Sequence, residues 1–257
     1  MKALHLAIGI FDGVHLGHRM LIGKAVENAR NTHAWSGVLS FHPHPQKVLG
    51  LPQAPKMIYP IQQRYQLLQE LEVDHIFVKH FTSAWSQFQP DRFFSFLKRI
   101  FPNLHMVYVG EDFHFGHQRK GSVATLETFC QKESHVHLNV MQPCTYEGKR
   151  ICSTRIRHAL QTGQIDLVNT LLGKSYHRLG QLKHLKKHYP YNIQFPYPYE
   201  IQLPPDTYAV QLCAKDYFSP AKLTVETSSS MLVEPEITPP THQSITINFL
   251  SDTPASR

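Results

Sequence analysis

The sequence lacks the marks of secreted, membrane-spanning and repetitive proteins. Among its 257 residues, no apolar stretch reaches the roughly 18 residues needed to span a bilayer. The first residues lead into a strand-like segment without a small-residue cleavage site, so no signal peptide is expected. No internal repeat and no long low-complexity tract is present. We therefore expect a cytoplasmic protein that does not enter a membrane.

Cysteine is scarce. The four cysteines are widely spaced and none forms a C-x-x-C pair: Cys130, Cys144, Cys152 and Cys213. This spacing is typical of free, buried thiols in a reducing compartment and argues against a structural zinc site. No metal-ligating residues are predicted.

Acidic residues are also few. The formal net charge is +7, and residues 149–187 hold nine Lys and Arg but one acid, Asp166. Such a local basic field attracts phosphates, on a nucleotide or on a nucleic acid; a solvated basic face is the alternative. Because no aromatic stacking platform accompanies the charges, nucleic-acid binding is not expected.

The first two-thirds of the chain alternate strand and helix patterns. Strand-like apolar runs occupy residues 4–10, 37–41, 75–81, 106–109 and 136–140, and helical patterns occupy 16–29, 61–71, 90–100 and 123–132. This alternation predicts a Rossmann-like α/β fold, a doubly wound parallel sheet with right-handed crossovers. Ligands of such sheets bind beyond the carboxyl ends of the strands.

The pattern changes near Leu172-Gly173. Prolines cluster beyond this point, β-prone runs lie at 208–212, 222–225 and 245–249, and no convincing amphipathic helix follows. The sequence therefore predicts an α/β domain over residues 1–175 and a small antiparallel β domain or barrel over residues 176–257.

The decapeptide Gly9-Ile10-Phe11-Asp12-Gly13-Val14-His15-Leu16-Gly17-His18 follows the first strand and opens the first helix. Backbone N–H groups and the helix dipole favour an anion there, and Gly13 and Gly17 let a phosphate approach closely. His15 and His18 share one face of the first turn and can donate to phosphate oxygens. A single histidine near a helix start is usually structural, and a pair without a third ligand is a poor zinc site.

A second segment runs from Ile151 to Arg157 and precedes a helical run. Ser153 or Thr154 is the expected N-cap. A capped basic helix would explain these residue types. The functional interpretation is that both hydroxyls and the Arg157 guanidinium bind the β- and γ-phosphates of a nucleotide.

With these residues in place, the chain resembles the adenylyltransferase module of the bacterial bifunctional riboflavin kinase/FMN adenylyltransferases, in the HxGH nucleotidyltransferase superfamily. The resemblance covers about residues 5–180. Besides the two segments above, it rests on Phe41-His42-Pro43-His44-Pro45, Arg64, Val109–Gly116, Arg119, Gly121 and Leu172–Tyr176. The Pro-His-Pro loop and the Gly-Glu-Asp-Phe segment narrow the superfamily to this family.

The resemblance implies that the phosphate of FMN attacks the α-phosphorus of ATP, giving FAD and pyrophosphate, with Mg²⁺ on the ATP phosphates. It assigns catalysis to His15, His18 and Arg157; ATP binding to Gly9, Phe11, Asp12, Gly17, Gly110, Ser153 and Thr154; and flavin binding to Pro43, His44, Pro45, Asp112 and Phe115. Core packing is the alternative for Phe115. Cys152 departs from the family, which usually has Ser there.

The second half resembles a reduced riboflavin kinase barrel. The nearest match to the kinase's Pro-Thr-Ala-Asn motif is Tyr189–Ile193, which lacks the Thr, and Gln243 stands near the place of the catalytic Glu. We expect no riboflavin kinase activity. Two other functions stay open: transfer to a different phosphorylated acceptor or from CTP, and a non-catalytic role in binding flavin or nucleotide. The oligomeric state is not predicted.

Overall fold

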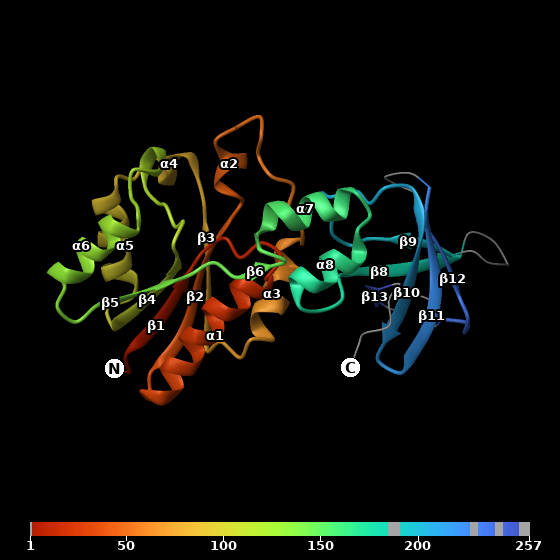
Figure 1. Ribbon diagram of the computed structural model, residues 1–257, viewed down its shortest axis with the longest axis horizontal. Helices are drawn as coiled ribbons and strands as arrows, with labels where there is room; N and C mark the ends of the chain where they lie inside the picture. The colour runs from red at the N-terminus through yellow and green to blue at the C-terminus, as the bar shows by residue number, and fades with distance from the viewer. Residues whose placement is uncertain (1, 185–190, 227–230, 240–243, 252–257) are drawn as a thin grey trace. The chain divides into compact units, whose positions relative to one another are not determined.

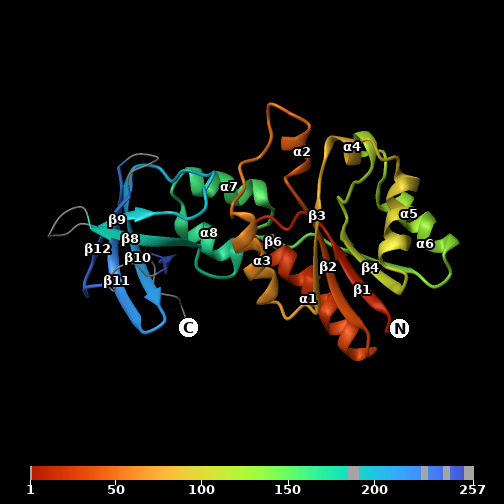
Figure 2. The same ribbon diagram turned by 180° about the vertical axis from the view of Figure 1, so that it is seen from behind.

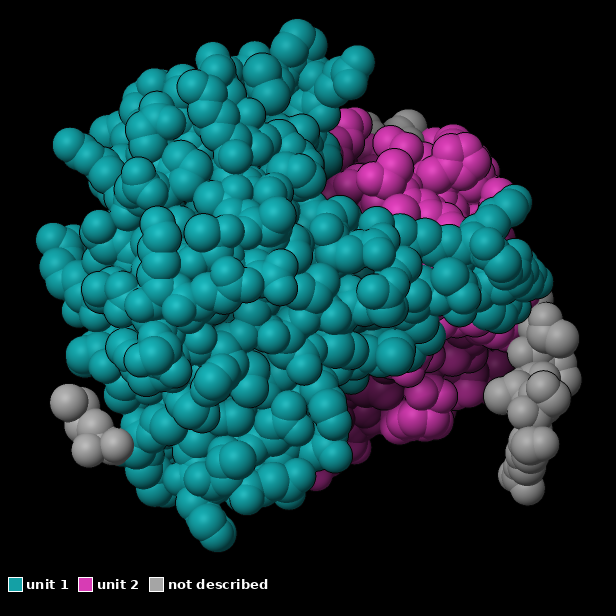
Figure 3. All heavy atoms as spheres, turned by 60° about the vertical axis from the view of Figure 1, so that its left-hand side comes forward, with its two compact units in different colours: residues 1–55, 61–150 teal, residues 56–60, 151–257 magenta. Residues whose placement is uncertain are grey.

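The computed structural model describes residues 2–184, 191–226, 231–239 and 244–251. The chain forms two compact units, coloured separately in Figure 3. The first comprises residues 1–55 and 61–150, and the second comprises residues 56–60 and 151–257. The boundary between units thus falls at residue 150, whereas the strands of the second unit begin at His177, just beyond the predicted domain boundary.

The first unit contains a five-stranded parallel sheet in the order β3-β2-β1-β4-β5. Its strands are β1 (Leu4–Ile8), β2 (Trp35–His42), β3 (His75–His80), β4 (Leu104–Gly110) and β5 (His137–Met141). All four neighbouring pairs are parallel. The predicted sheet is confirmed: each of the five apolar runs lies in one of its strands.

Helices lie on both faces of this sheet (Figures 1 and 2). One face carries α1 (Leu16–Asn31) and α3 (Ile61–Gln69), and the other carries α5 (Pro90–Ile100) and α6 (Val123–Lys132). The α5 side is rich in phenylalanine: Phe93, Phe94, Phe96, Phe115 and Phe129 are all buried in one apolar cluster. The short helices α2 (Pro45–Val48) and α4 (Ser83–Ser86), the turn η1 (His117–Arg119) and the hairpin of β6 (Thr145–Tyr146) and β7 (Lys149–Arg150) were not predicted.

The strand order places a topological switch point between β1 and β4. From β1 the chain moves outward through β2 to β3, and it then returns to place β4 on the other side of β1. The loops after β1 and β4 therefore diverge from the same point of the sheet edge. In open α/β sheets, such a point forms the ligand-binding crevice.

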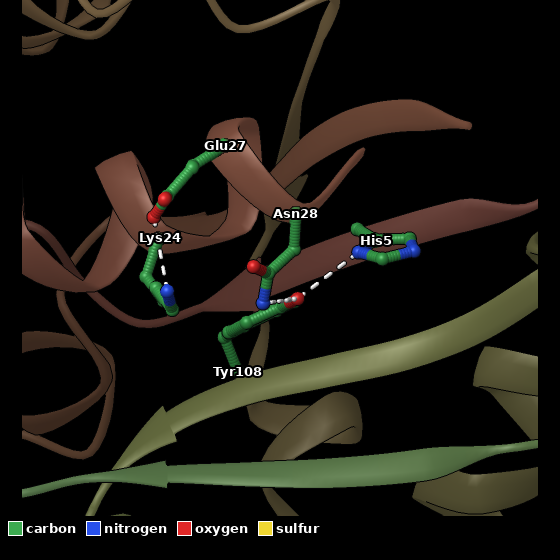
Figure 4. A network of polar contacts seen from close by, with 5 residues as sticks. All are labelled: His5, Lys24, Glu27, Asn28 and Tyr108. Carbon is green, nitrogen blue, oxygen red and sulfur yellow. Dashed lines mark hydrogen bonds and ion pairs between the residues drawn. The ribbon is translucent and has the colours of Figure 1, made fainter. Parts of the chain in front are cut away.

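A polar network lies between α1 and the sheet (Figure 4). The Tyr108 hydroxyl accepts from Asn28 Nδ2 at 2.9 Å and lies 3.0 Å from His5 Nδ1. Burial and the neighbouring His105 lower the pKa of His5 from its usual 6.5. The His5 side chain therefore favours the neutral form in the folded protein.

The second unit holds α7 (Ser153–Gln161), α8 (Ile165–Leu172) and a closed barrel in the order β10-β11-β12-β9-β8-β13. Its strands are β8 (His177–His184), β9 (Tyr191–Gln194), β10 (Asp206–Ala214), β11 (Tyr217–Val225), β12 (Met231–Pro235) and β13 (Ser244–Phe249). Their pairings are antiparallel, as predicted. β8, β9 and β12 were not predicted individually.

Arg178 is buried in this barrel, with 1% of its surface exposed. Its guanidinium donates to the Tyr176 hydroxyl at 3.0 Å and to the Ile201 carbonyl at 2.8 Å. It also lies 4.8 Å from the centroid of the Tyr199 ring. Carbonyl, hydroxyl and aromatic faces thus solvate a buried cation. Across the described residues, none of the helices is long and apolar enough to cross a membrane.

Candidate functional site

The decapeptide forms the β1–α1 loop and the first turn of α1, at the switch point. His15 is the N-cap of α1, with extended backbone, and its Nδ1 accepts from the backbone N–H of His18 at 3.3 Å. The two imidazole rings stack with centroids 3.6 Å apart and an interplanar angle of 18°. The two histidines therefore act as one rigid pair.

The cap bond decides where neutral His15 carries its hydrogen. Because Nδ1 accepts a bond, the hydrogen of the neutral ring is on Nε2. An imidazole in this tautomer presents a donor away from the helix start. Beside the positive end of a 16-residue helix, such a donor suits a phosphate oxygen.

The loop before the histidines is buried and strained. Phe11, Asp12 and Gly13 are buried, and Phe11 and Val14 have left-handed φ angles of 52° and 44°. A Cβ on Gly9 would lie 3.0 Å from the Phe11 ring. Because glycine has no Cβ, the ring can pack against the backbone of Gly9. Phe11 in turn contacts the His18 ring edge-on at 5.3 Å.

Gly17 keeps the first turn of α1 open beside the histidine pair. A Cβ there would contact the His15 ring at 3.4 Å and Cys144 Cβ at 3.7 Å. These are ordinary contact distances, so the glycine is not required by the fold. Because glycine has no side chain, a ligand can approach the backbone of this turn closely.

Beyond β4, the loop carries the second group of predicted residues in this unit. Gly110 ends the strand, and the exposed Asp112 pairs with Arg150 at 2.9 Å. Arg150 comes from the β6–β7 hairpin and also lies 3.9 Å from Glu111. Sequence reasoning missed Arg150; the Glu147-Gly148 turn of the hairpin was the available signal.

The predicted flavin loop follows β2. His42 ends that strand, the His42–Pro43 peptide bond is cis, and Pro43, His44 and Pro45 are all half-buried. His44 caps α2, its Nδ1 accepting from the N–H of Gln46 at 3.2 Å. The loop thus presents two rigid proline rings and a tethered imidazole at the carboxyl edge of the sheet.

Phe115 lies in the core of the first unit, with 8% of its surface exposed. Its ring is 4.8 Å from Phe93, 5.3 Å from Phe94 and 5.5 Å from Phe113. Core packing, the alternative for this ring, is what the structure shows. Phe113, which is half-buried and stacked on Phe115, is the more accessible ring of this pair.

The predicted N-cap of the second motif is wrong. α7 begins at Ser153, and Cys152 is its N-cap, with extended backbone and no side-chain cap bond. A thiol is a weak acceptor, so it leaves the N-terminal amides of the helix without the cap that a Ser would supply. Arg157, one turn along, donates from Nε to the Lys56 carbonyl at 2.8 Å.

The predicted residues therefore fall into two groups. The first unit holds Gly9, Phe11, Asp12, His15, Gly17, His18, Pro43, His44, Pro45, Gly110, Asp112 and Phe115. The second unit holds Ser153, Thr154 and Arg157. Among the barrel predictions, Tyr189, Pro190 and Gln243 lie outside the described residues.

A pocket of about 350 Å³ in the second unit contains none of these residues. It lies between the start of α8 and β10 and includes Asp166, Asp206, Thr207 and Tyr208. Two carboxylates in its lining disfavour a phosphate. We therefore place the candidate site at the β1–α1 loop.

The cysteines are free, as predicted, but only Cys130 is buried; the other three are half-buried. Burial, with a smaller effect of Glu127, raises the pKa of the Cys130 thiol to about 11. Its thiolate is therefore rare at neutral pH, and Cys130 serves as a small apolar residue.

Comparison with known proteins points to one family. A family model described as FAD synthetase matches residues 1–155. The chain is 33% identical over 180 residues to the bifunctional riboflavin kinase/FMN adenylyltransferase of Bacillus subtilis, covering 70% of this chain but 56% of that protein. It thus aligns with little more than half of that relative's length.

A second relative and a solved structure are also similar to this chain. The chain is 33% identical over 169 residues to a putative bifunctional riboflavin kinase/FMN adenylyltransferase of Geobacillus thermodenitrificans, covering 65% of this chain and 88% of that protein. A crystal structure described as a macrolide-efflux protein from Streptococcus pneumoniae has a TM-score of 0.85 at 21% identity, over 97% of this chain and 84% of that one. At that identity the likeness shows the fold alone.

Proposed function

The chain belongs to the FAD synthetase family, and on that premise we propose that it transfers the AMP unit of MgATP to FMN, giving FAD and pyrophosphate. The observation that carries this proposal is the stacked pair of His15 and His18 at the N-terminus of α1, with centroids 3.6 Å apart. Two imidazoles at the positive end of a helix suit a phosphate chain whose charge grows during transfer.

The reaction requires little proton chemistry. An oxygen of the FMN phosphate is already ionised and attacks the α-phosphorus of ATP in line. The P–O bond to the β-phosphate breaks, and pyrophosphate leaves with the electron pair. Positioning and charge stabilisation therefore supply most of the catalysis. In this proposal His15 and His18 donate to the phosphate oxygens, and Gly9, Phe11, Asp12, Gly17 and Gly110 shape the nucleotide site.

The same proposal assigns Ser153, Thr154 and Arg157 to the β- and γ-phosphates. It is supported by the start of α7, where the N-cap residue Cys152 makes no side-chain cap bond. Amides at such a start, together with a guanidinium one turn along, are a common phosphate-binding arrangement. Magnesium enters with the nucleotide as part of the MgATP substrate.

FMN is the proposed acceptor because Pro43, His44 and Pro45 form a half-buried loop at the edge of the same sheet. Asp112, held by Arg150 at 2.9 Å, is the polar contact that we propose for the flavin. For the aromatic contact, Phe113 replaces the buried Phe115, because its ring is the more exposed of the two.

We further propose that the barrel does not phosphorylate riboflavin. This rests on the sequence at Tyr191-Asn192, which lacks the Thr of the kinase motif, and on Gln243, an amide that cannot act as a base. The reaction would take place in the cytoplasm, where free thiols stay reduced.

One assay tests both proposals. The purified protein is incubated with MgATP and either FMN or riboflavin, and the flavins are separated by chromatography. We expect FAD from FMN and no product from riboflavin. FMN or FAD formed from riboflavin would show a working kinase, and no FAD from FMN would favour a different acceptor or a binding role.

A further inference from the structure

The backbone between β1 and α1 adopts a conformation that L-residues avoid. Phe11, Gly13 and Val14 have φ angles of 52°, 84° and 44°, and Val14 is β-branched. Such conformations persist only where the surroundings hold them. The loop that carries the histidine pair therefore depends on contacts from elsewhere in the fold.

One peptide group at the start of this loop is held from two sides. The Ile10 carbonyl accepts from Ser40 Oγ at 2.9 Å and from Arg64 NH1 at 2.8 Å. Both donor side chains are 2% exposed, one on β2 and the other on α3. Two buried donors, one of them charged, engage both lone pairs of this oxygen.

The clamped carbonyl lies directly before Phe11. Rotation of this peptide group would turn the backbone of Phe11, whose ring packs on Gly9 and meets the His18 ring edge-on at 5.3 Å. His18 in turn stacks on His15. A continuous series of contacts thus runs from Arg64 and Ser40 to the imidazole pair.

We propose that Arg64 and Ser40 are positioning residues for adenylyl transfer, which set the orientation of the His15–His18 pair through the Ile10 carbonyl. The expected loss of kcat rests on the proposed function. The expected change in the histidine pair rests on the geometry of the loop alone. Neither residue needs to touch a substrate, so the expected effect is on the chemical step and not on substrate binding.

The matched control lies on the same strand. Ser36 is also 2% exposed on β2, and its hydroxyl bonds to Asp74 Oδ2 at 2.7 Å, at the opposite end of the strand from the loop. Ser36→Ala removes two bonds of a buried hydroxyl, one donated to Asp74 Oδ2 and one accepted from the Asp74 N–H at 3.0 Å, whereas Ser40→Ala removes one. Only Ser40→Ala removes a bond to the Ile10 carbonyl.

The kinetic test compares Ser40→Ala, Arg64→Met and Arg64→Lys with Ser36→Ala. We expect Ser40→Ala and Arg64→Met to lower kcat for FAD formation by about tenfold or more, with the KM values for ATP and FMN nearly unchanged. Arg64→Lys should recover part of the loss, because an ammonium can still donate to the carbonyl. Ser36→Ala should keep the wild-type kcat.

Two kinetic outcomes would overturn the proposal. In the first, Ser40→Ala matches Ser36→Ala in kcat. In the second, the Arg64 variants raise KM at constant kcat, which would mean that Arg64 binds a substrate directly.

A second readout keeps this inference separate from the proposed function. The imidazole resonances of His15 and His18, assigned with His15→Gln and His18→Gln proteins, are recorded by NMR without substrates. Ser40→Ala and Arg64→Met should shift or broaden them, and Ser36→Ala should not. If the wild type makes no FAD but these resonances respond, the proposed function fails, and the positioning role of Ser40 and Arg64 is supported. If the resonances do not respond, that positioning role is wrong, whatever the activity.

Discussion

Nδ1 of His15 accepts the backbone N–H of His18 at 3.3 Å, and the two rings stack with centroids 3.6 Å apart. One hydrogen bond thus caps α1, selects the tautomer of His15 and aligns two donors. The arrangement makes the candidate site rigid before any nucleotide binds, which is the condition for strong electrostatic stabilisation of a transition state.

Removing either imidazole should abolish most of the activity. We expect His15→Ala and His18→Ala each to lower kcat/KM for FAD formation by about 10²–10³-fold, because a donor to the developing charge is lost. Steady-state assays with MgATP and FMN measure this. The control is His135→Ala, an exposed histidine before β5; an equal loss in the control would mean that the effect is not specific to the pair.

Replacing Arg157 by Lys should weaken nucleotide binding despite the kept charge. The guanidinium fork both donates to the Lys56 carbonyl and matches phosphate oxygens, whereas an ammonium does one or the other. We expect the KM for ATP to rise by about tenfold, with a smaller change in the KM for FMN. His158→Ala, exposed on the same helix, serves as the control. An unchanged KM for ATP would remove Arg157 from the site.

Replacing Pro43 should weaken the binding of FMN more than the binding of ATP. In Pro43→Ala the rigid ring after His42 is lost, so we expect the KM for FMN to rise by about tenfold while the KM for ATP stays within about twofold. Kinetics with each substrate varied in turn provide the measurement. If activity with FMN is fully retained, transfer to another phosphorylated acceptor becomes the better hypothesis.

The first unit should lose stability in mild acid through His5. Its pKa is lowered from 6.5 in the folded protein, so the unfolded chain takes up the proton at higher pH. The free energy of unfolding therefore falls as the pH drops below about 6.5. Burial raises the pKa of the neighbouring Tyr108 above 10.0, so this hydroxyl stays neutral throughout.

Urea unfolding at about pH 7.5 and about pH 5.5 measures the effect. Both tryptophans, Trp35 and Trp85, lie in the first unit, so their fluorescence reports on it. His5→Gln should reduce the difference between the two pH values, and His135→Gln, at an exposed position, should not. Equal pH dependence in all three proteins would contradict the assignment to His5.

Two glycine substitutions should change stability in opposite directions. A Cβ on Gly121 would lie 2.6 Å from the Phe115 ring, which other phenylalanines hold in place, so Gly121→Ala should destabilise by about 1–3 kcal/mol. A Cβ on Gly23, inside α1, meets nothing within 4 Å, so Gly23→Ala should stabilise by about 0.5–1 kcal/mol. Denaturation of both variants and the wild type tests the pair. A neutral Gly121→Ala would mean that the Phe115 ring moves freely.

Short-range pattern was enough to predict the architecture. The alternation of apolar strands with helical repeats over residues 4–140 predicted the parallel sheet, because burial on both faces produces continuous apolar runs. The decapeptide at residues 9–18 predicted the turn from the first strand into the first helix for a similar reason, because its glycines and histidines act within one turn of chain. The first motif and the β domain are thus determined by the sequence itself.

Contacts between distant residues required the tertiary structure. Ser40 and Arg64 meet at the Ile10 carbonyl, Arg150 meets Asp112, and Phe115 is enclosed by Phe93 and Phe94. The first helical residue of α7 also differs from the predicted one. Composition and spacing describe what a residue can do, but its partners depend on how strands and helices pack. That packing assigned Phe115 to the core and made a buried arginine the support of the histidine pair.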